Sequence, residues 1–69
     1  MTRRLRLDAK DVRVGDRVVF LDHLRDRMLL VSDRRVTSMG NVAIRATEGD
    51  IHTVLYRRPH ELVIVEREE

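Results

Sequence analysis

Three pairs of adjacent arginines are the residues of this chain best suited to recognition chemistry. They lie far apart in the sequence, at Arg3 and Arg4, Arg34 and Arg35, and Arg57 and Arg58. The planar guanidinium group donates hydrogen bonds in a fork that matches a phosphate or a carboxylate. If the fold brings these pairs to one surface, they can neutralise the phosphates of a nucleic acid with little reading of its sequence.

The overall charge is less one-sided than these pairs suggest. The chain has 14 Lys and Arg against 12 Asp and Glu, which gives a net charge of +2 at pH 7. A strongly basic nucleic-acid binder carries a larger excess of positive charge. A second interpretation therefore stays open, in which the arginines solvate strand edges and oppose aggregation.

Side chains that bind metals or act as nucleophiles are few and match no known pattern. The chain has no cysteine, and the spacings of His23, His52 and His60 fit no zinc motif. Ser32 and Ser38 do not lie in a nucleophile elbow, and the three glycines form no phosphate-binding loop. We therefore expect no enzyme activity, no catalytic residue, no metal and no cofactor.

The aromatic residues also narrow the range of functions. Phe20 and Tyr56 are the only ones in the chain. A proline-rich peptide groove, a methyl-lysine cage and a base-stacking platform each use several rings, so these sites are disfavoured. Phe20 lies in an apolar run and is predicted to be in the core. Tyr56, beside Arg57 and Arg58, is a candidate for an exposed contact residue.

The elements that position these residues are predicted to be short strands joined by turns. Glycine accepts a positive φ and aspartate bonds to its own backbone, which favours turns where they cluster. Turns are predicted at residues 15–16, 40–41, 48–50 and 57–61, and strands at residues 17–22, 28–38, 42–47, 51–56 and 62–65. In residues 42–47, alternation directs Val42, Ile44 and Ala46 inwards and Arg45 outwards. His52 is expected to face solvent.

Residues 22–31 fit two descriptions. A helix capped by Asp22 would be barely three turns long. We favour a polar loop over residues 23–27, followed by a strand from Met28. This strand has a bulge or charged break at residues 33–35.

The recurrence of short strands predicts an all-β domain with five or six antiparallel strands. The run Val-Gly-Asp-Arg-Val at residues 14–18, the long loop, the glycine turns and the Pro59 segment before a last apolar strand resemble a Src-homology-3-like small barrel. The resemblance covers residues 12–66 and extends to uncharacterised arginine-rich small proteins of actinobacteria and their phages. It implies a closed barrel and no particular activity. Residues 1–11 are expected to form an arm or a first strand, and residues 67–69 an acidic tail.

Two functions remain open. The first is a non-catalytic module that contacts nucleic-acid backbone through Arg34, Arg35, Arg57 and Arg58, with Arg3 and Arg4 on a flexible arm. The second is a protein interaction or assembly module that acts as a homo-oligomer. A phage-encoded protein is one form of this alternative. Residues 18–21, 28–31 and 62–65 are apolar on both faces, which predicts a dimer or a partner surface unless Leu5 and Leu7 cover the surplus.

The location expected for this chain is the cytoplasm. Its longest apolar runs have four residues, far fewer than the roughly 20 of a membrane-spanning helix. The basic N-terminal residues are not followed by the apolar core of a signal peptide. The lack of cysteine fits a reducing compartment, and no membrane partner is expected.

Overall fold

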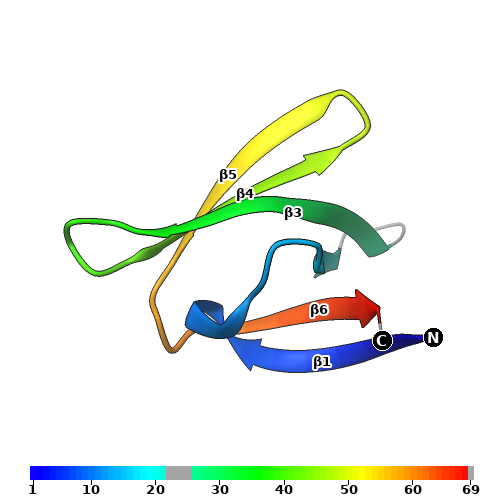
Figure 1. Ribbon diagram of the computed structural model, residues 1–69, viewed down its shortest axis with the longest axis horizontal. Coiled ribbons are helices and arrows are strands. Elements are labelled where there is room, and N and C mark those ends of the chain that lie inside the picture. The colour runs from blue at the N-terminus through cyan, green and yellow to red at the C-terminus, as the bar shows by residue number, and fades with distance from the viewer. Residues whose placement is uncertain (22–25, 69) are drawn as a thin grey trace.

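The computed structural model of this protein describes residues 1–21 and 26–68, which are almost entirely β-strand and turn (Figure 1). The elements are β1 (Thr2–Asp8), the 3-10 helix η1 (Ala9–Asp11), β2 (Arg17–Leu21), β3 (Asp26–Val36), β4 (Val42–Glu48), β5 (Ile51–Arg57) and β6 (Leu62–Glu68). In the described part of the chain, the six strands form one antiparallel sheet in the order β1-β6-β2-β3-β4-β5. The prediction of an all-β, antiparallel fold is confirmed.

The sheet is bent into two layers. In Figure 1, β3, β4 and β5 form the upper layer and β1 and β6 the lower one. β2 connects them, because it pairs along its length with β3 but meets β6 only at Arg17–Glu66 and Val18–Val65. The sheet is not closed into a barrel, since the end strands β1 and β5 do not pair among the described residues. The expected closed barrel is therefore wrong: β1 pairs with β6 on one side only, and β5 with β4 on one side only, among these residues.

The hydrophobic core lies on the side of the sheet that faces inwards. Val42, Ile44 and Ala46 of β4 point into it, as alternation predicted, and none is more than 1% exposed. The buried cluster comprises Ala9, Val12, Val18, Val31, Val42, Ile44, Val63 and Val65. Phe20 packs against this cluster but remains partly exposed.

The N-terminal residues 2–8 form a full strand of the sheet. β1 pairs with β6 along its whole length, so Arg3 and Arg4 do not lie on a flexible arm. Leu5 and Leu7 lie opposite Val65 and Val63 and pack against the core. Leu5 and Leu7 therefore cover part of the apolar surface of the strands that the sequence predicted to be apolar on both faces.

β3 confirms the strand predicted from Met28 onwards, although it already begins at Asp26. Its pairing with β4 shifts between Val31 and Asp33, so the irregularity is at Ser32, next to the predicted break. The first part of the predicted 23–27 loop, with His23, and the alternative helix cap at Asp22 lie outside the described residues.

Glycines with a positive φ occupy predicted turns of the chain. Gly15 has a φ of 96° and Gly40 a φ of 83°, values that residues with a side chain rarely adopt. No other residue type in the described part of the chain has a positive φ, so the tolerance of Asn41 for this conformation is not used.

A buried ion pair joins the turn before β2 to β6. The Asp16 carboxylate is 2% exposed, and it accepts two hydrogen bonds of 2.8 Å from the Arg67 guanidinium and one of 2.9 Å from the Arg13 N–H. Burial acts to raise the pKa of Asp16, but these hydrogen bonds and the charges of Arg67 and Arg13 bring it below its ordinary value. Arg67, predicted to begin the acidic tail, is therefore part of the folded sheet. Glu69 lies outside the described residues.

Candidate nucleic-acid interface

One exposed side of β3, β4 and β5 carries the charged and aromatic side chains most suited to binding a ligand. We call it the outer face, and its residues are Asp33, Arg35, Ala43, Arg45, Val54 and Tyr56. The strand register places Arg35, Ala43 and Tyr56 in one row across the three strands. Facing residues of antiparallel strands point to the same side of a sheet. Since Ala43 alternates with buried neighbours, this side points away from the core.

The ring of Tyr56 is accessible on the outer face. Tyr56 is 64% exposed, and Val54 in the adjacent row is 41% exposed. The small side chain of Ala43 lies between Tyr56 and Arg35 and leaves a shallow hollow of about 150 Å³. A planar group can therefore reach the ring next to a guanidinium.

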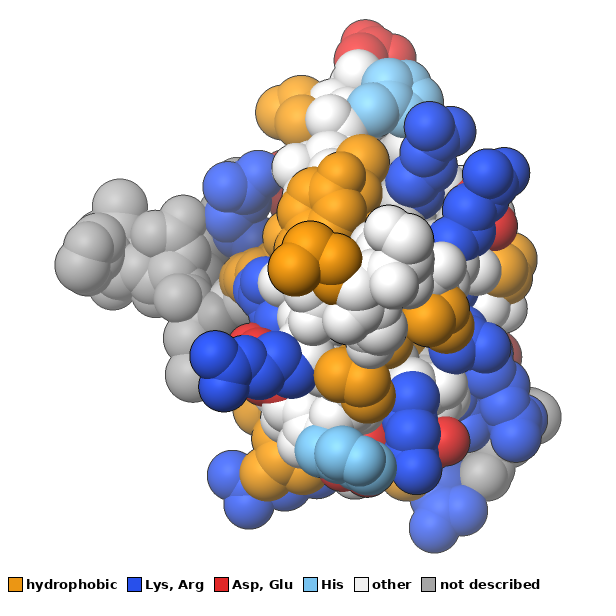
Figure 2. All heavy atoms as spheres, turned by 90° about the vertical axis from the view of Figure 1, so that its left-hand side faces the viewer, with side chains coloured by type: hydrophobic (Ala, Val, Ile, Leu, Met, Phe, Trp, Pro, Cys, Tyr) orange, Lys and Arg blue, Asp and Glu red, His pale blue; other side chains and the backbone are white. Residues whose placement is uncertain are grey.

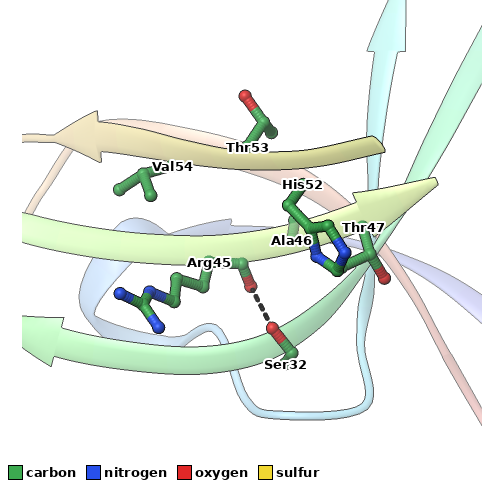
Figure 3. Close-up of a pocket in the computed structure, with 7 residues that line it drawn as sticks. All are labelled: Ser32, Arg45, Ala46, Thr47, His52, Thr53 and Val54. Atoms are coloured by element: carbon green, nitrogen blue, oxygen red, sulfur yellow. Dashed lines mark hydrogen bonds between the residues drawn. The ribbon is translucent and has the colours of Figure 1, made fainter. Parts of the chain in front are cut away.

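A second hollow of about 320 Å³ adjoins the outer face and shares Arg45 and Val54 with it (Figure 3). The Ser32 hydroxyl donates a hydrogen bond of 3.3 Å to the carbonyl oxygen of Arg45. His52 lies opposite Thr47 in the register and is exposed, as predicted. The accessible surface thus continues from Tyr56 towards the β4–β5 turn.

The outer face carries more positive than negative charge. Arg35 donates a hydrogen bond of 2.9 Å from Nε to Asp33. The pKa of Asp33 is below its ordinary value, mainly because of this hydrogen bond. Desolvation acts to raise the pKa, whereas the hydrogen bond from the Arg34 N–H and the charges of Arg35 and Arg45 lower it further. The Arg45 guanidinium has no hydrogen bond or ion pair within the described residues. Two guanidinium groups therefore share one carboxylate, and the charge of Arg45 is the less compensated.

The adjacent residues Arg34 and Arg35 point to opposite sides of the sheet. Arg34 lies opposite Ile44, on the side that faces the core, whereas Arg35 lies opposite Ala43. Nη1 of Arg34 donates a hydrogen bond of 2.8 Å to the Lys10 carbonyl oxygen, which ties β3 to η1. Only Arg35 of this pair belongs to the outer face.

The pair Arg57 and Arg58 is also divided. Arg57 lies opposite Val42 on the core-facing side and forms an ion pair of 3.3 Å with Glu61. Arg58 follows β5 and is exposed, and its guanidinium has no hydrogen bond or ion pair with the part of the chain that the structure describes. Of these two arginines, Arg58 is the one available to a ligand.

Arg3 and Arg4 lie on β1, in the other layer of the sheet (Figure 1). Nη2 of Arg4 is 2.6 Å from Oε2 of Glu66 on the neighbouring strand. The six arginines predicted to bind nucleic acid therefore do not share one surface.

A groove lies between the β3–β4 hairpin and the β5–β6 turn. It has a volume of about 830 Å³ and is lined by Met39, Gly40, Asn41, Arg58, Pro59, His60 and Glu61. Figure 2 views the molecule from this end, with hydrophobic side chains near the centre and Lys and Arg side chains along one side. Arg58, two residues after Tyr56, thus places a further guanidinium at the end of β5.

Arg45 is a residue of the outer face that the sequence did not single out as a binding residue. Alternation in residues 42–47 directed its side chain outwards, and the structure confirms that it is exposed. In the sequence Arg45 has no arginine beside it, whereas the predicted binding residues form adjacent pairs. Its position beside Tyr56 follows from the β4–β5 register, which the sequence does not display.

Within residues 1–21 and 26–68, no three His, Cys, Asp or Glu side chains gather as a metal site. The same residues contain no helix whose length and hydropathy would allow it to cross a bilayer. No family model matches this chain, and neither a curated protein nor a solved structure matches it.

Proposed function

We propose that this protein is a non-catalytic module that binds single-stranded nucleic acid on its outer face. Tyr56 stacks on a base, and Arg35 and Arg45 contact phosphates. Arg58, which lines the groove at the end of β5, contacts a further phosphate. The observation that supports this most is the exposed Tyr56 ring in one row with Arg35 and beside Arg45, whose guanidinium has no partner among the described residues.

The chemistry of the outer face favours a single strand over a duplex. Unpaired bases expose their faces and stack on aromatic side chains, whereas a duplex buries those faces. Guanidinium groups on the same surface neutralise the backbone and release its counterions. Because one ring holds one base, we expect weak, salt-sensitive binding with little preference for sequence.

We also propose that the fold is related to the Src-homology-3-like small barrel. The meander β2–β3–β4–β5, with β6 returning beside β2, supports an open form of the Src-homology-3-like arrangement, to which β1 adds a further strand. In this arrangement the sheet is a scaffold, and its exposed side chains supply the binding.

A titration followed by fluorescence anisotropy tests the proposal. Short labelled single strands of DNA and RNA with mixed sequence are titrated at about 50 mM salt, where electrostatic binding is strong. We expect saturable binding that weakens as salt increases, with a log–log slope of about −0.7 for each phosphate contact.

A duplex of the same sequence is the control, and we expect it to bind more weakly. Equal affinity for the duplex would remove the stacking role of Tyr56. No saturable binding to either single strand at this salt concentration would overturn the proposal.

A further inference from the structure

We infer that a second copy of this chain pairs with the free edge of β5, antiparallel and with Val54 opposite Val54 of the second copy. The inference is independent of the proposed function, because oligomeric state is measured without nucleic acid. It rests on the hydrogen-bonding groups, the charge and the self-complementary order of residues along β5.

β5 is an end strand of the sheet, so on one of its sides the backbone groups have no strand partner among the described residues. Gly49, with a φ of 58°, is the first residue of the two-residue turn between β4 and β5, which is the pattern of a type II′ hairpin. The closing pair Glu48–Ile51 is then hydrogen-bonded, and alternate residues of β5 direct their N–H and C=O groups outwards. Val54 is one of these outward residues, together with His52 and Tyr56.

The two end strands of the sheet differ in charge. β1 carries Arg3, Arg4 and Arg6, which oppose the approach of another strand with the same charges. Residues 51–56 contain no charged residue other than the titratable His52, and no proline. Two of their apolar side chains, Ile51 and Tyr56, are 56% and 64% exposed. β5 therefore lacks the features that usually protect an edge strand from pairing.

The residue order along β5 complements itself about Val54. In the antiparallel register centred there, Tyr56 faces His52 of the second copy, and continuing outwards Arg58 faces Asp50 of the second copy. A two-fold axis produces each of these pairings twice.

Charge decides between this register and its neighbours. Arg58 and Asp50 are both exposed, and neither side chain has a hydrogen bond or ion pair within the described residues. A shift of the register by two residues brings either Arg58 opposite His52 or Tyr56 opposite Asp50, so the favourable pair of opposite charges is lost. The charge complementarity of the strand ends therefore selects a second copy of the chain as the partner.

The dimer would make the two outer faces continuous. Facing residues of antiparallel strands share one side of the sheet, so Val54 and Tyr56 of both copies point the same way. The two sets of Arg45 and Tyr56 would then lie on one extended surface.

Disulfide cross-linking tests both the dimer and its register. The chain has no cysteine of its own, so Val54→Cys introduces a single reactive thiol. Facing Cα atoms of a hydrogen-bonded antiparallel pair are about 5.5 Å apart, which is within the range of Cα distances that disulfides join. We expect Val54→Cys to form a covalent dimer under mild oxidation and to lose it with reductant.

Two matched variants serve as controls. His52→Cys alters an exposed residue of the same strand that does not face its own copy, and Val36→Cys alters an exposed residue of β3. Neither should cross-link at the rate of Val54→Cys. Equal cross-linking of all three variants would mean random collision and would overturn the register.

Sedimentation of the unoxidised protein gives an independent measurement. We expect a dimer in equilibrium with the 8.2 kDa monomer. Val54→Glu should shift the equilibrium towards monomer, because two carboxylates then face each other across the two-fold axis. Within each copy, Arg45 lies opposite the new carboxylate, so the fold itself should tolerate this substitution. Val36→Glu should leave the equilibrium unchanged. A wild-type chain that remains monomeric at the highest soluble concentration would overturn the inference.

Discussion

The Asp16 carboxylate and the Arg67 guanidinium form two hydrogen bonds of 2.8 Å each, although the two residues are 51 positions apart in the chain. Asp16 also accepts the Arg13 N–H, so both of its oxygens are used inside the protein. The backbone of Asp16 is also bonded to β3, because the Val31 N–H donates a hydrogen bond of 2.8 Å to the Asp16 carbonyl oxygen. One buried acidic residue thus connects the first turn, β3 and β6.

Replacing the partner of this carboxylate should strongly destabilise the protein. Arg67→Ala leaves a buried charge without its partner, which costs about 3–5 kcal/mol of the free energy of unfolding. Urea denaturation measures this loss. Arg17→Ala is the matched control, since Arg17 and Glu68 form an exposed pair 3.7 Å apart, and exposed pairs contribute about 1 kcal/mol or less. Equal losses in the two variants would show that the buried pair has no special role.

The same carboxylate should make stability depend on pH. The pKa of Asp16 in the folded protein is below the ordinary value of 3.8, so its stabilising effect is complete above that value and is lost as the pH falls through the folded pKa. We expect Asp16→Asn to be less stable than wild type at neutral pH and to lose less stability on acidification. The measurement is the urea midpoint as a function of pH. A wild-type midpoint that stays level in acid would contradict this expectation.

Two valines that face each other across β3 and β4 should respond very differently to truncation. Val42 is 1% exposed and Val36 is 65% exposed. Val42→Ala removes two buried carbon groups and leaves a cavity, at a cost of about 2 kcal/mol. Val36→Ala should change the free energy of unfolding by no more than about 0.5 kcal/mol. Similar values for the two variants would show that β4 does not present Val42 to the core.

Removing the Tyr56 ring should weaken binding to single-stranded nucleic acid. Tyr56→Ala eliminates base stacking, which contributes about 1–3 kcal/mol per base. Tyr56→Phe keeps the ring and should bind nearly as well as wild type. Anisotropy titrations of the three proteins with the same probe compare the affinities. An unchanged affinity for Tyr56→Ala would assign binding to another surface.

Removing the Arg45 charge should act through the phosphates instead. We expect Arg45→Ala to lower affinity similarly for all sequences and to reduce the magnitude of the salt slope by about 0.7, the contribution of one contact to a single strand. Arg6→Ala is the matched control, because Arg6 is an exposed arginine on β1 in the other layer. If Arg6→Ala has the same effect, binding depends on net charge and not on the outer face.

Local features of this fold could be predicted because they depend on neighbouring residues. Alternation of apolar and polar residues has the period of a strand, so the inward direction of Val42 and Ile44 and the outward direction of Arg45 follow from the sequence. Turns at Gly15 and Gly40 follow from the backbone freedom of glycine. The antiparallel all-β class follows from the short spacing between these turns.

The candidate site was only partly predictable. Tyr56 was predicted to be exposed, and it is; the binding roles predicted for Arg35 and Arg58 stay predictions. Arg34 and Arg57 were selected with their neighbours, but successive residues of a strand point to opposite sides, so adjacency in the sequence separates their guanidinium groups in space.

Only the tertiary structure decided which distant residues meet. Many acidic residues could have paired with Arg67, and the topology of β6 selects Asp16. The pairing of β1 with β6, and the absence of a β1–β5 pairing among the described residues, are long-range features that no local pattern records. The register of β3, β4 and β5 brings Arg35, Ala43 and Tyr56 into one row. The sequence by itself determined the period and the turns, because these are local properties of the chain. Strand order and register required the fold, because they depend on hydrogen bonds and packing between segments that are far apart in the chain.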